Sequence, residues 1–146
     1  MLKYFLFFPC LLYFGFSQIN AQNHVTWNFS YDKSSDKIII KGTIDKGWHL
    51  YSQKTPLNAG PIPTTVKINK IKGLKLIGNY SEDLVPHEIF DPNFESKVYL
   101  FEDSYLSSQK IKCKNIQQIT GKIEYMVCDD TRCIPPIEVP FTIQLK

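Results

Sequence analysis

In the stretch that decides its fold class, the chain reads Gly121-Lys122-Ile123-Glu124-Tyr125-Met126-Val127-Cys128. Ile123, Tyr125 and Val127 alternate with other residues, and a period of two places them together on one face of a β-strand. Residues 137–145 alternate in the same way after the double proline at 135–136. Both stretches therefore predict strands with one buried face.

Short segments rich in β-branched and aromatic residues run through the rest of the chain. They predict strands at 25–29, 37–44, 48–51, 64–71, 97–101 and 109–113. Turn signals separate them at 34–36, 45–47, 58–61, 91–93 and 135–136. Seven to nine short strands in about 120 residues are typical of an all-β, immunoglobulin-like antiparallel β-sandwich, which is the predicted fold.

The first 21 residues have the composition of a secretory signal peptide. Lys3 supplies a positive charge, an apolar run follows at 4–16, and Ala21 is a small residue suited to signal peptidase. The run of thirteen residues is shorter than the ~20 that a spanning helix needs. We therefore expect export, cleavage after Ala21, a mature domain at 22–146, and no membrane insertion after cleavage.

The composition limits the classes of partner. The chain has 17 Lys or Arg and 14 Asp or Glu residues, a formal net charge of +3, and no basic cluster. This balance gives no reason to expect a nucleic acid or an anionic membrane as partner. The sequence also lacks a Gly-rich phosphate loop and a paired-carboxylate motif. We expect no cofactor, no metal and a monomer.

Three cysteines remain after the predicted signal peptide, which contains Cys10. A disulfide between Cys128 and Cys133 would close a ring of only six residues. Its chain-entropy contribution is about 2 kcal/mol, against about 4–5 kcal/mol for a loop near a hundred residues. A tight bridge is also more easily strained and reduced than one between distant segments. We therefore interpret this pair as redox-active.

Strand periodicity assigns a face to each cysteine. Cys128 is predicted on the polar side of its strand, with Lys122 and Glu124. Cys113 shares a face with Ile111 and is predicted to be a buried, unreacting thiol. A disulfide from Cys113 to Cys128 or Cys133 remains an alternative, although Cys113 is predicted on a core face and Cys128 on a polar face.

A short strand at 47–52 and a loop at 86–95 are candidates for the surround of the disulfide. Their aromatic and imidazole side chains include His49, Tyr51, Phe90 and Phe94. A phenyl ring over a disulfide excludes water and competing thiols. Nearby carboxylates raise the pKa of a thiol, whereas Arg132 lowers it. Each of these residues also has an ordinary alternative as a core aromatic or a solvated charge.

Two other functions stay open. The disulfide could simply close a loop in a non-catalytic sandwich domain that binds a partner protein. The reduced protein could instead bind copper(I), a soft ion suited to thiolates and thioethers. The ligands would be Cys128, Cys133, Met126 and one of His24, His49 or His87.

Four motifs in chain order are similar to those of one known family. They are Gly47-Trp48-His49-Leu50-Tyr51-Ser52, Gly60-Pro61-Ile62-Pro63-Thr64, Phe90-Asp91-Pro92-Asn93-Phe94, and Tyr125-Met126-Val127-Cys128 to Cys133-Ile134-Pro135-Pro136. Over nearly all of the mature chain, the sequence resembles the periplasmic N-terminal domain of the thiol:disulfide interchange protein DsbD.

The resemblance implies a periplasmic protein whose disulfide takes electrons from a thioredoxin-like reductase or a membrane electron carrier. It passes them to oxidised periplasmic proteins, including those of cytochrome c biogenesis. By position, Cys133 would form the mixed disulfides and Cys128 would resolve them. The surround would be His49 and Tyr51, a cap of Phe90 or, with a slight preference, Phe94, and the acidic residues Glu88 and Asp91.

The sequence departs from the family pattern in two ways. Four residues separate Cys128 from Cys133, where the best-known relatives have five. The sequence stops at Lys146, after the last predicted strand, without the membrane segment and thioredoxin-like domain of the full-length protein. We therefore expect a shuttle, reductase-like but not self-sufficient, that is served by another reductase.

Overall fold

The computed structural model describes residues 23–145. The predicted signal peptide and Cys10 lie outside these residues. Within them no helix is long and apolar enough to cross a membrane. The strands are β1 (Val25–Asp32), β2 (Lys37–Ile44), β3 (His49–Tyr51), β4 (Thr65–Ile68), β5 (Leu74–Glu82), β6 (His87–Asp91), β7 (Ser96–Glu102), β8 (Ser104–Cys113), β9 (Gln118–Cys128) and β10 (Cys133–Gln144).

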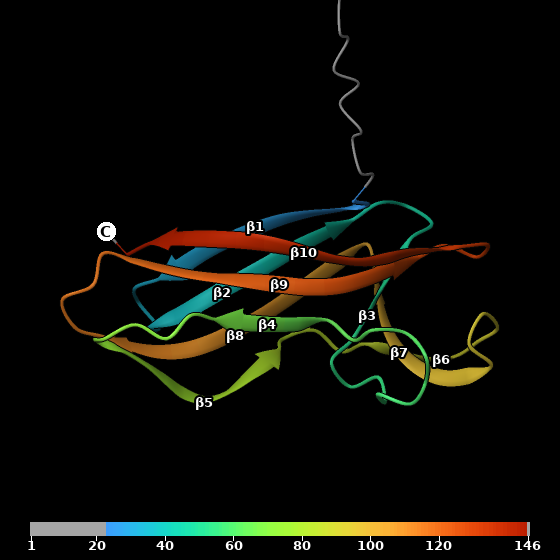
Figure 1. The fold of residues 1–146 in the computed structure, drawn as a ribbon, viewed down its shortest axis with the longest axis horizontal. Helices are drawn as coiled ribbons and strands as arrows, with labels where there is room; N and C mark the ends of the chain where they lie inside the picture. The colour runs from blue at the N-terminus through green and yellow to red at the C-terminus, as the bar shows by residue number, and fades with distance from the viewer. Residues whose placement is uncertain (1–22, 146) are drawn as a thin grey trace, which may run out of the picture.

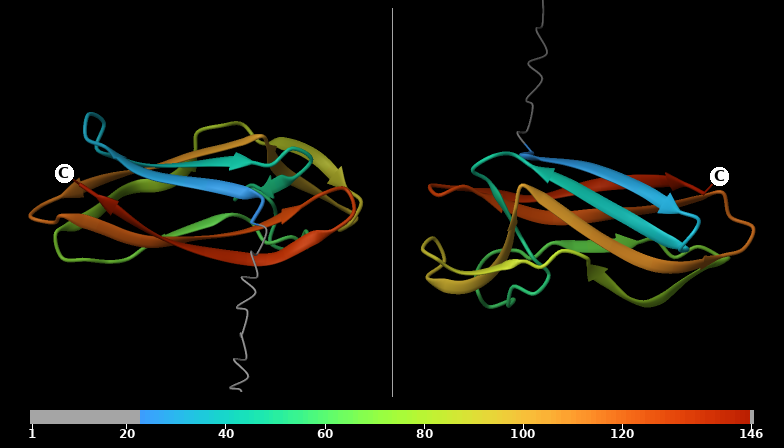
Figure 2. Two further views of the ribbon diagram at one scale, coloured as in Figure 1. Left: turned by 90° about the horizontal axis from the view of Figure 1, so that it is seen from above. Right: turned by 180° about the vertical axis from the view of Figure 1, so that it is seen from behind.

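Two antiparallel sheets form the sandwich (Figures 1 and 2). The smaller sheet has the order β1-β2-β8-β5, and the larger has the order β10-β9-β3-β7-β6. β4 pairs with β9 along the same edge as β3, closer to the start of β9. The predicted all-β, immunoglobulin-like sandwich is confirmed.

The main core lies between the sheets. Ile123, Tyr125 and Val127 on β9 are fully buried there, as the alternation of the sequence predicts. Leu50 on β3 and Ile40 on β2 belong to the same cluster. The strands with a clean period of two are thus held in register by burial of one face.

Several parts of the chain differ from the sequence prediction. β5 was not predicted, because a register shift between Ile77 and Ser81 interrupts its alternation. The predicted loop at 86–95 is a hairpin, in which β6 pairs with β7. Residues 135–136 are not a turn but part of β10, where the register shifts between Ile134 and Ile137. Proline has no backbone N–H to donate to a regular strand pair, but it is tolerated at such a bulge.

We expect Gly121→Ala to destabilise the larger sheet. A Cβ at this position would lie 2.5 Å from the Lys67 carbonyl oxygen on β4 and 2.5 Å from Cζ of Phe141 on β10. Overpacking of this kind costs about 1–3 kcal/mol. Urea denaturation of the oxidised protein should show this decrease in the free energy of unfolding. The control Lys122→Ala removes only an exposed ion pair with Glu138 and should change it by less than about 1 kcal/mol.

Candidate functional site

The last residue of β9 and the first of β10 are the two cysteines. Cys128 and Cys133 are direct partners in the antiparallel register, so their side chains lie on the same face of the sheet. Their Cα atoms are 4.0 Å apart and their sulfurs are bonded. The predicted pairing of the loop cysteines is confirmed.

The Asp129 side chain holds the turn between the cysteines. Its Oδ1 accepts hydrogen bonds from the backbone nitrogens of Thr131, at 2.7 Å, and Arg132, at 2.8 Å, and from the Thr131 hydroxyl. These bonds, led by that of the Thr131 hydroxyl, lower the pKa of Asp129. Asp followed by Thr two residues later is a sequence signal for such a turn.

The two cysteines differ in exposure. Cys128 is completely buried, whereas Cys133 is partly exposed. Cys128 therefore lies on the predicted face of its strand, but the expectation of polar surroundings there is wrong. It lies opposite the main core, as its position in the strand requires, but that face is covered here by apolar side chains rather than by water.

A second apolar cluster covers this outer face of the larger sheet. Its buried members are Tyr51, Ala59, Val98, Leu100 and Cys128, and the partly buried Phe94, Met126 and Cys133 pack against them. Ala59 belongs to the β3–β4 connection and Phe94 to the β6–β7 turn, and both segments lie beside the end of β9 (Figure 1). The disulfide is thus enclosed by segments distant in sequence.

Phe94 packs against Gly60 of the β3–β4 connection, with no room for a side chain at position 60. Its ring also meets Tyr51 edge-on, with centroids 6.0 Å apart. Phe90, on the edge strand β6, is 65% exposed. Of the two candidate cap residues, the structure brings only Phe94 into the cluster that contains the cysteines.

His49, Tyr51 and Asp91 form a buried chain of hydrogen bonds. Tyr51 Oη donates to Asp91 Oδ2 at 2.7 Å, and His49 Nε2 lies 3.1 Å from the same hydroxyl. Asp91 is 1% exposed, and its Oδ1 accepts a bond from the Asn93 backbone nitrogen at 2.8 Å. These hydrogen bonds therefore link β3 to the turn that carries Phe94.

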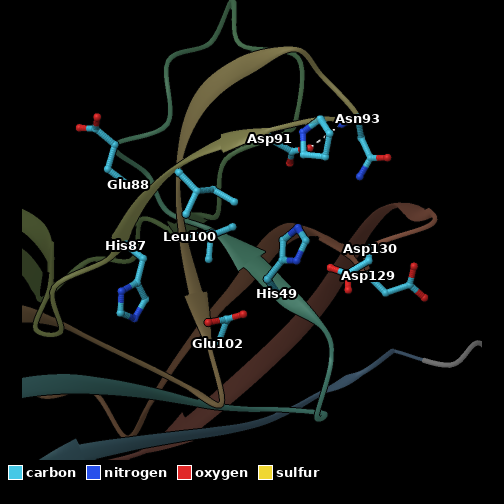
Figure 3. Close-up of a pocket in the computed structure, with 11 residues that line it drawn as sticks. His49, His87, Glu88, Asp91, Asn93, Leu100, Glu102, Asp129 and Asp130 are labelled. Atoms are coloured by element: carbon cyan, nitrogen blue, oxygen red, sulfur yellow. Dashed lines mark hydrogen bonds between the residues drawn. The ribbon is translucent and has the colours of Figure 1, made fainter.

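A cavity of about 460 Å³ opens beside these hydrogen-bonded side chains. Figure 3 shows His49 at its centre, between Glu102 and the Asp129–Asp130 turn. Burial is the main influence on His49 and lowers its pKa, although Asp91, Glu102, Asp130 and Asp129 act in the opposite direction. The imidazole is consequently neutral at neutral pH.

Two predicted site residues have partners of their own. Glu88 lies on β6 and accepts hydrogen bonds from Lys97, at 3.0 Å, and from Tyr99, at 2.8 Å. These bonds, first that of Lys97, lower the pKa of Glu88. The Arg132 guanidinium lies 5.5 Å from the Trp48 ring centroid, and its Nε is 3.6 Å from Asp129 Oδ2.

The prediction that Cys113 is buried is wrong. Cys113 is an exposed free thiol at the last position of β8. The alternation that buries Ile111 does not reach the strand end, where only Leu74 lies opposite. Its thiol pKa is nevertheless raised, mainly by partial burial and then by Asp36.

The part of the chain that the structure describes gathers no cluster of metal-ligating side chains. Among residues 23–145 there is no group of three or more His, Cys, Asp or Glu that could hold a metal ion. The sulfurs of Cys128 and Cys133 are joined to each other. Met126 Sδ lies 3.5 Å from the Ile62 backbone nitrogen, so it contributes to packing of the β3–β4 connection.

The sequence matches one family over most of its length. The family described as "Thiol:disulfide interchange protein DsbD, N-terminal" matches residues 17–144. A comparison with curated protein sequences gave no match.

Solved structures with the same fold are distant in sequence. The Neisseria meningitidis DsbD N-terminal domain in the reduced form has a TM-score of 0.62 at 16% identity, over 83% of this chain and 85% of that one. The same domain in complex with the PilB N-terminal domain gives 0.60 at 15%, over 86% and 87%. The N-terminal periplasmic domain of ScsB from Proteus mirabilis gives 0.62 at 12%, over 87% of this chain but 49% of that one.

We expect Phe94→Ala to increase the rate at which a small dithiol reduces the disulfide, by roughly tenfold, because exchange rates depend on access to sulfur. Gly60→Ala should have the same effect by displacing the ring. Phe90→Ala is the matched control and should leave the rate unchanged, since this ring is already exposed. Stopped-flow measurement of thiol formation gives the rates. Equal rates for Phe94→Ala and the unsubstituted protein would contradict a cap.

We also expect His49 to destabilise the fold in weak acid. Its pKa is lower in the folded protein than the ~6.5 of an unfolded chain. The unfolded chain therefore binds the proton first, and the free energy of unfolding falls as pH decreases below ~6.5, by at most about 1.4 kcal/mol per pH unit. Urea denaturation at pH ~7.5 and ~5.5 should show a smaller fall for His49→Gln. An equal fall in both proteins would contradict the shift.

Proposed function

The chain belongs to the family of DsbD N-terminal domains, and from this premise we propose that it exchanges electrons with other proteins through the Cys128–Cys133 disulfide. The observation that carries the proposal is the unequal exposure of the two bonded cysteines, of which only Cys133 reaches solvent. An incoming thiolate must approach a sulfur directly in order to attack it. Cys133 is therefore the point of attack, and Cys128 is the leaving group.

The reaction proceeds through a mixed disulfide. A donor thiolate attacks Cys133 Sγ, the internal S–S bond breaks, and Cys128 leaves with the bonding electron pair. A second donor thiolate then resolves the mixed disulfide and leaves both protein cysteines reduced. The reduced Cys133 next attacks an acceptor disulfide, and Cys128 displaces the acceptor thiol. Two electrons pass from donor to acceptor in each cycle.

The surround controls which thiols take part. Phe94 covers the cluster that holds the sulfurs, and we assign it the role of cap. His49, Tyr51 and Asp91 hold the turn that carries this ring. Glu88 and Arg132 lie at the margin of the site, where they can contact a docked protein.

The donor in this proposal is a thioredoxin-like reductase or a membrane electron carrier. The complex of the Neisseria domain with the PilB N-terminal domain supports a protein partner of the same kind. The acceptors are oxidised exported proteins, including those of cytochrome c biogenesis. The compartment is the periplasm, as it is for the similar periplasmic domain of ScsB from Proteus mirabilis, and the predicted signal peptide at 1–21 provides the route.

We expect mixed-disulfide trapping to separate the roles of the cysteines. Cys128→Ser, first converted at its remaining thiol to a mixed disulfide with a small aromatic thiol, should form a stable adduct with a reduced thioredoxin-like protein that lacks its resolving cysteine. The partner thiolate attacks Cys133 Sγ and the aromatic thiol leaves, and neither protein has a second sulfur that could displace the partner. Cys133→Ser should form no adduct. Non-reducing electrophoresis and mass spectrometry identify the products, with Cys113→Ser as the common background because Cys113 is an exposed thiol. Adducts of equal yield from both variants would overturn the assignment.

The reduction potential distinguishes exchange from a purely structural bridge. We expect a value above about −300 mV in equilibrium with a dithiol buffer, because structural disulfides of exported proteins lie below it. A lower value would support the alternative of a non-catalytic binding module. The same titration in Phe94→Ala tests whether the cap changes the equilibrium or only the rate.

A further inference from the structure

Four directly paired residues form a row across the larger sheet. Glu102 on β7 is opposite His49 on β3, His49 is also opposite Cys128 on β9, and Cys128 is opposite Cys133 on β10. Directly opposite side chains share a face, with Cβ atoms about 4.5–5.5 Å apart. The imidazole is thus the neighbour of Cys128 on the side away from Cys133.

The hydrogen bonds of Tyr51 determine the tautomer of His49. The single hydroxyl proton of Tyr51 is donated to Asp91, so the same oxygen accepts a bond from His49 Nε2. Nε2 therefore carries a proton. In the neutral ring Nδ1 then has a free lone pair and can accept a proton from a neighbouring group.

The groups that face the imidazole are mostly acidic. Glu102 comes from β7, Asp91 from the end of β6, and Asp129 and Asp130 from the β9–β10 turn. His87 and Glu88 of β6 line the same cavity. These carboxylates and the burial of Cys128 both disfavour a thiolate at its sulfur. The reduced Cys128 thiol consequently needs a nearby base before it can attack.

Resting on the exchange function proposed above, the geometry points to His49 as the group that exchanges a proton with Cys128. In the mixed disulfide, His49 Nδ1 takes the proton from the Cys128 thiol. The resulting thiolate attacks Cys133 Sγ, and the bond between Cys133 and the partner sulfur breaks. The partner leaves as a thiolate, and the imidazolium returns its proton to solvent. In the reverse direction the imidazolium protonates Cys128 as it leaves.

The attack by Cys128 can be measured separately from the attack by Cys133. Reduced protein with Cys113→Ser is mixed with one equivalent of an aromatic disulfide that releases a coloured thiol. The first release reports the reaction of Cys133, and the second reports displacement by Cys128. The second phase is independent of protein concentration, so its pH profile reports deprotonation at Cys128.

We expect His49→Gln to slow the second phase about tenfold at neutral pH and to remove an inflection below pH ~6.5. The reduction is smaller than the ~10²–10⁴ range of a positioned general base, because a thiol ionises more readily than a hydroxyl. Gln keeps an N–H that can donate to Tyr51 but cannot accept a proton. A second phase with unchanged rate and profile in His49→Gln would overturn the inference and leave the exchange function intact.

Tyr51→Phe is the matched control, because it breaks the link to Asp91 and keeps the imidazole. It should retain the inflection in the pH profile. Retention of the inflection in Tyr51→Phe together with its loss in His49→Gln would assign it to the imidazole itself, whereas an inflection that persists in His49→Gln would overturn the inference. Failure of the trapping experiment with Cys128→Ser would instead contradict the exchange function itself.

A titration by NMR requires no substitution at His49. The imidazole C–H signals are followed against pH in the reduced protein and in reduced Cys128→Ala. We expect different titration midpoints, because two groups that share a proton titrate as a coupled pair. Identical midpoints would overturn the inference, whether or not His49→Gln folds.

Discussion

The register of β9 against its neighbours decides which side chains surround the sulfurs. Cys128 lies opposite His49 on one side and Cys133 on the other. Since side chains alternate, a slip of one residue would turn Cys128 into the main core and bring Val127 to the site. Burial of Val127 and Tyr125 between the sheets opposes that slip. The packing of the sandwich therefore sets the geometry of a reactive bond at its end.

The site also requires that this end of the larger sheet be covered on both faces. The β3–β4 connection and the β6–β7 turn bring Ala59 and Phe94 onto the outer face. Without them both cysteines would be open to any thiol. With them one sulfur is enclosed and the other is reachable, so an apparently symmetric bond has a defined point of attack. Packing here provides chemical selectivity as well as stability.

The alternation of apolar and polar residues predicted those features that depend only on neighbouring residues in a strand. It gave the bounds of β2 and the core face of β9. It failed at the surroundings of Cys128, whose cover includes Ala59 and Phe94, more than thirty residues earlier in the chain, and at Cys113, where the sheet ends. The bond between Tyr51 and Asp91 spans 40 residues. The motif resemblance places both residues in the surround of the disulfide, which local alternation alone does not.

The charges around the disulfide explain why transfer of the Cys128 thiol proton matters more here than stabilisation of a Cys128 thiolate. Arg132 is the cation nearest in sequence to the cysteines, but its guanidinium lies by Trp48 and Asp129. Carboxylates dominate the cavity beside Cys128. A thiolate at a buried sulfur is costly in such a field. A neutral imidazole in the same row avoids that cost, because it removes the thiol proton only when the sulfur attacks and returns it when the sulfur leaves.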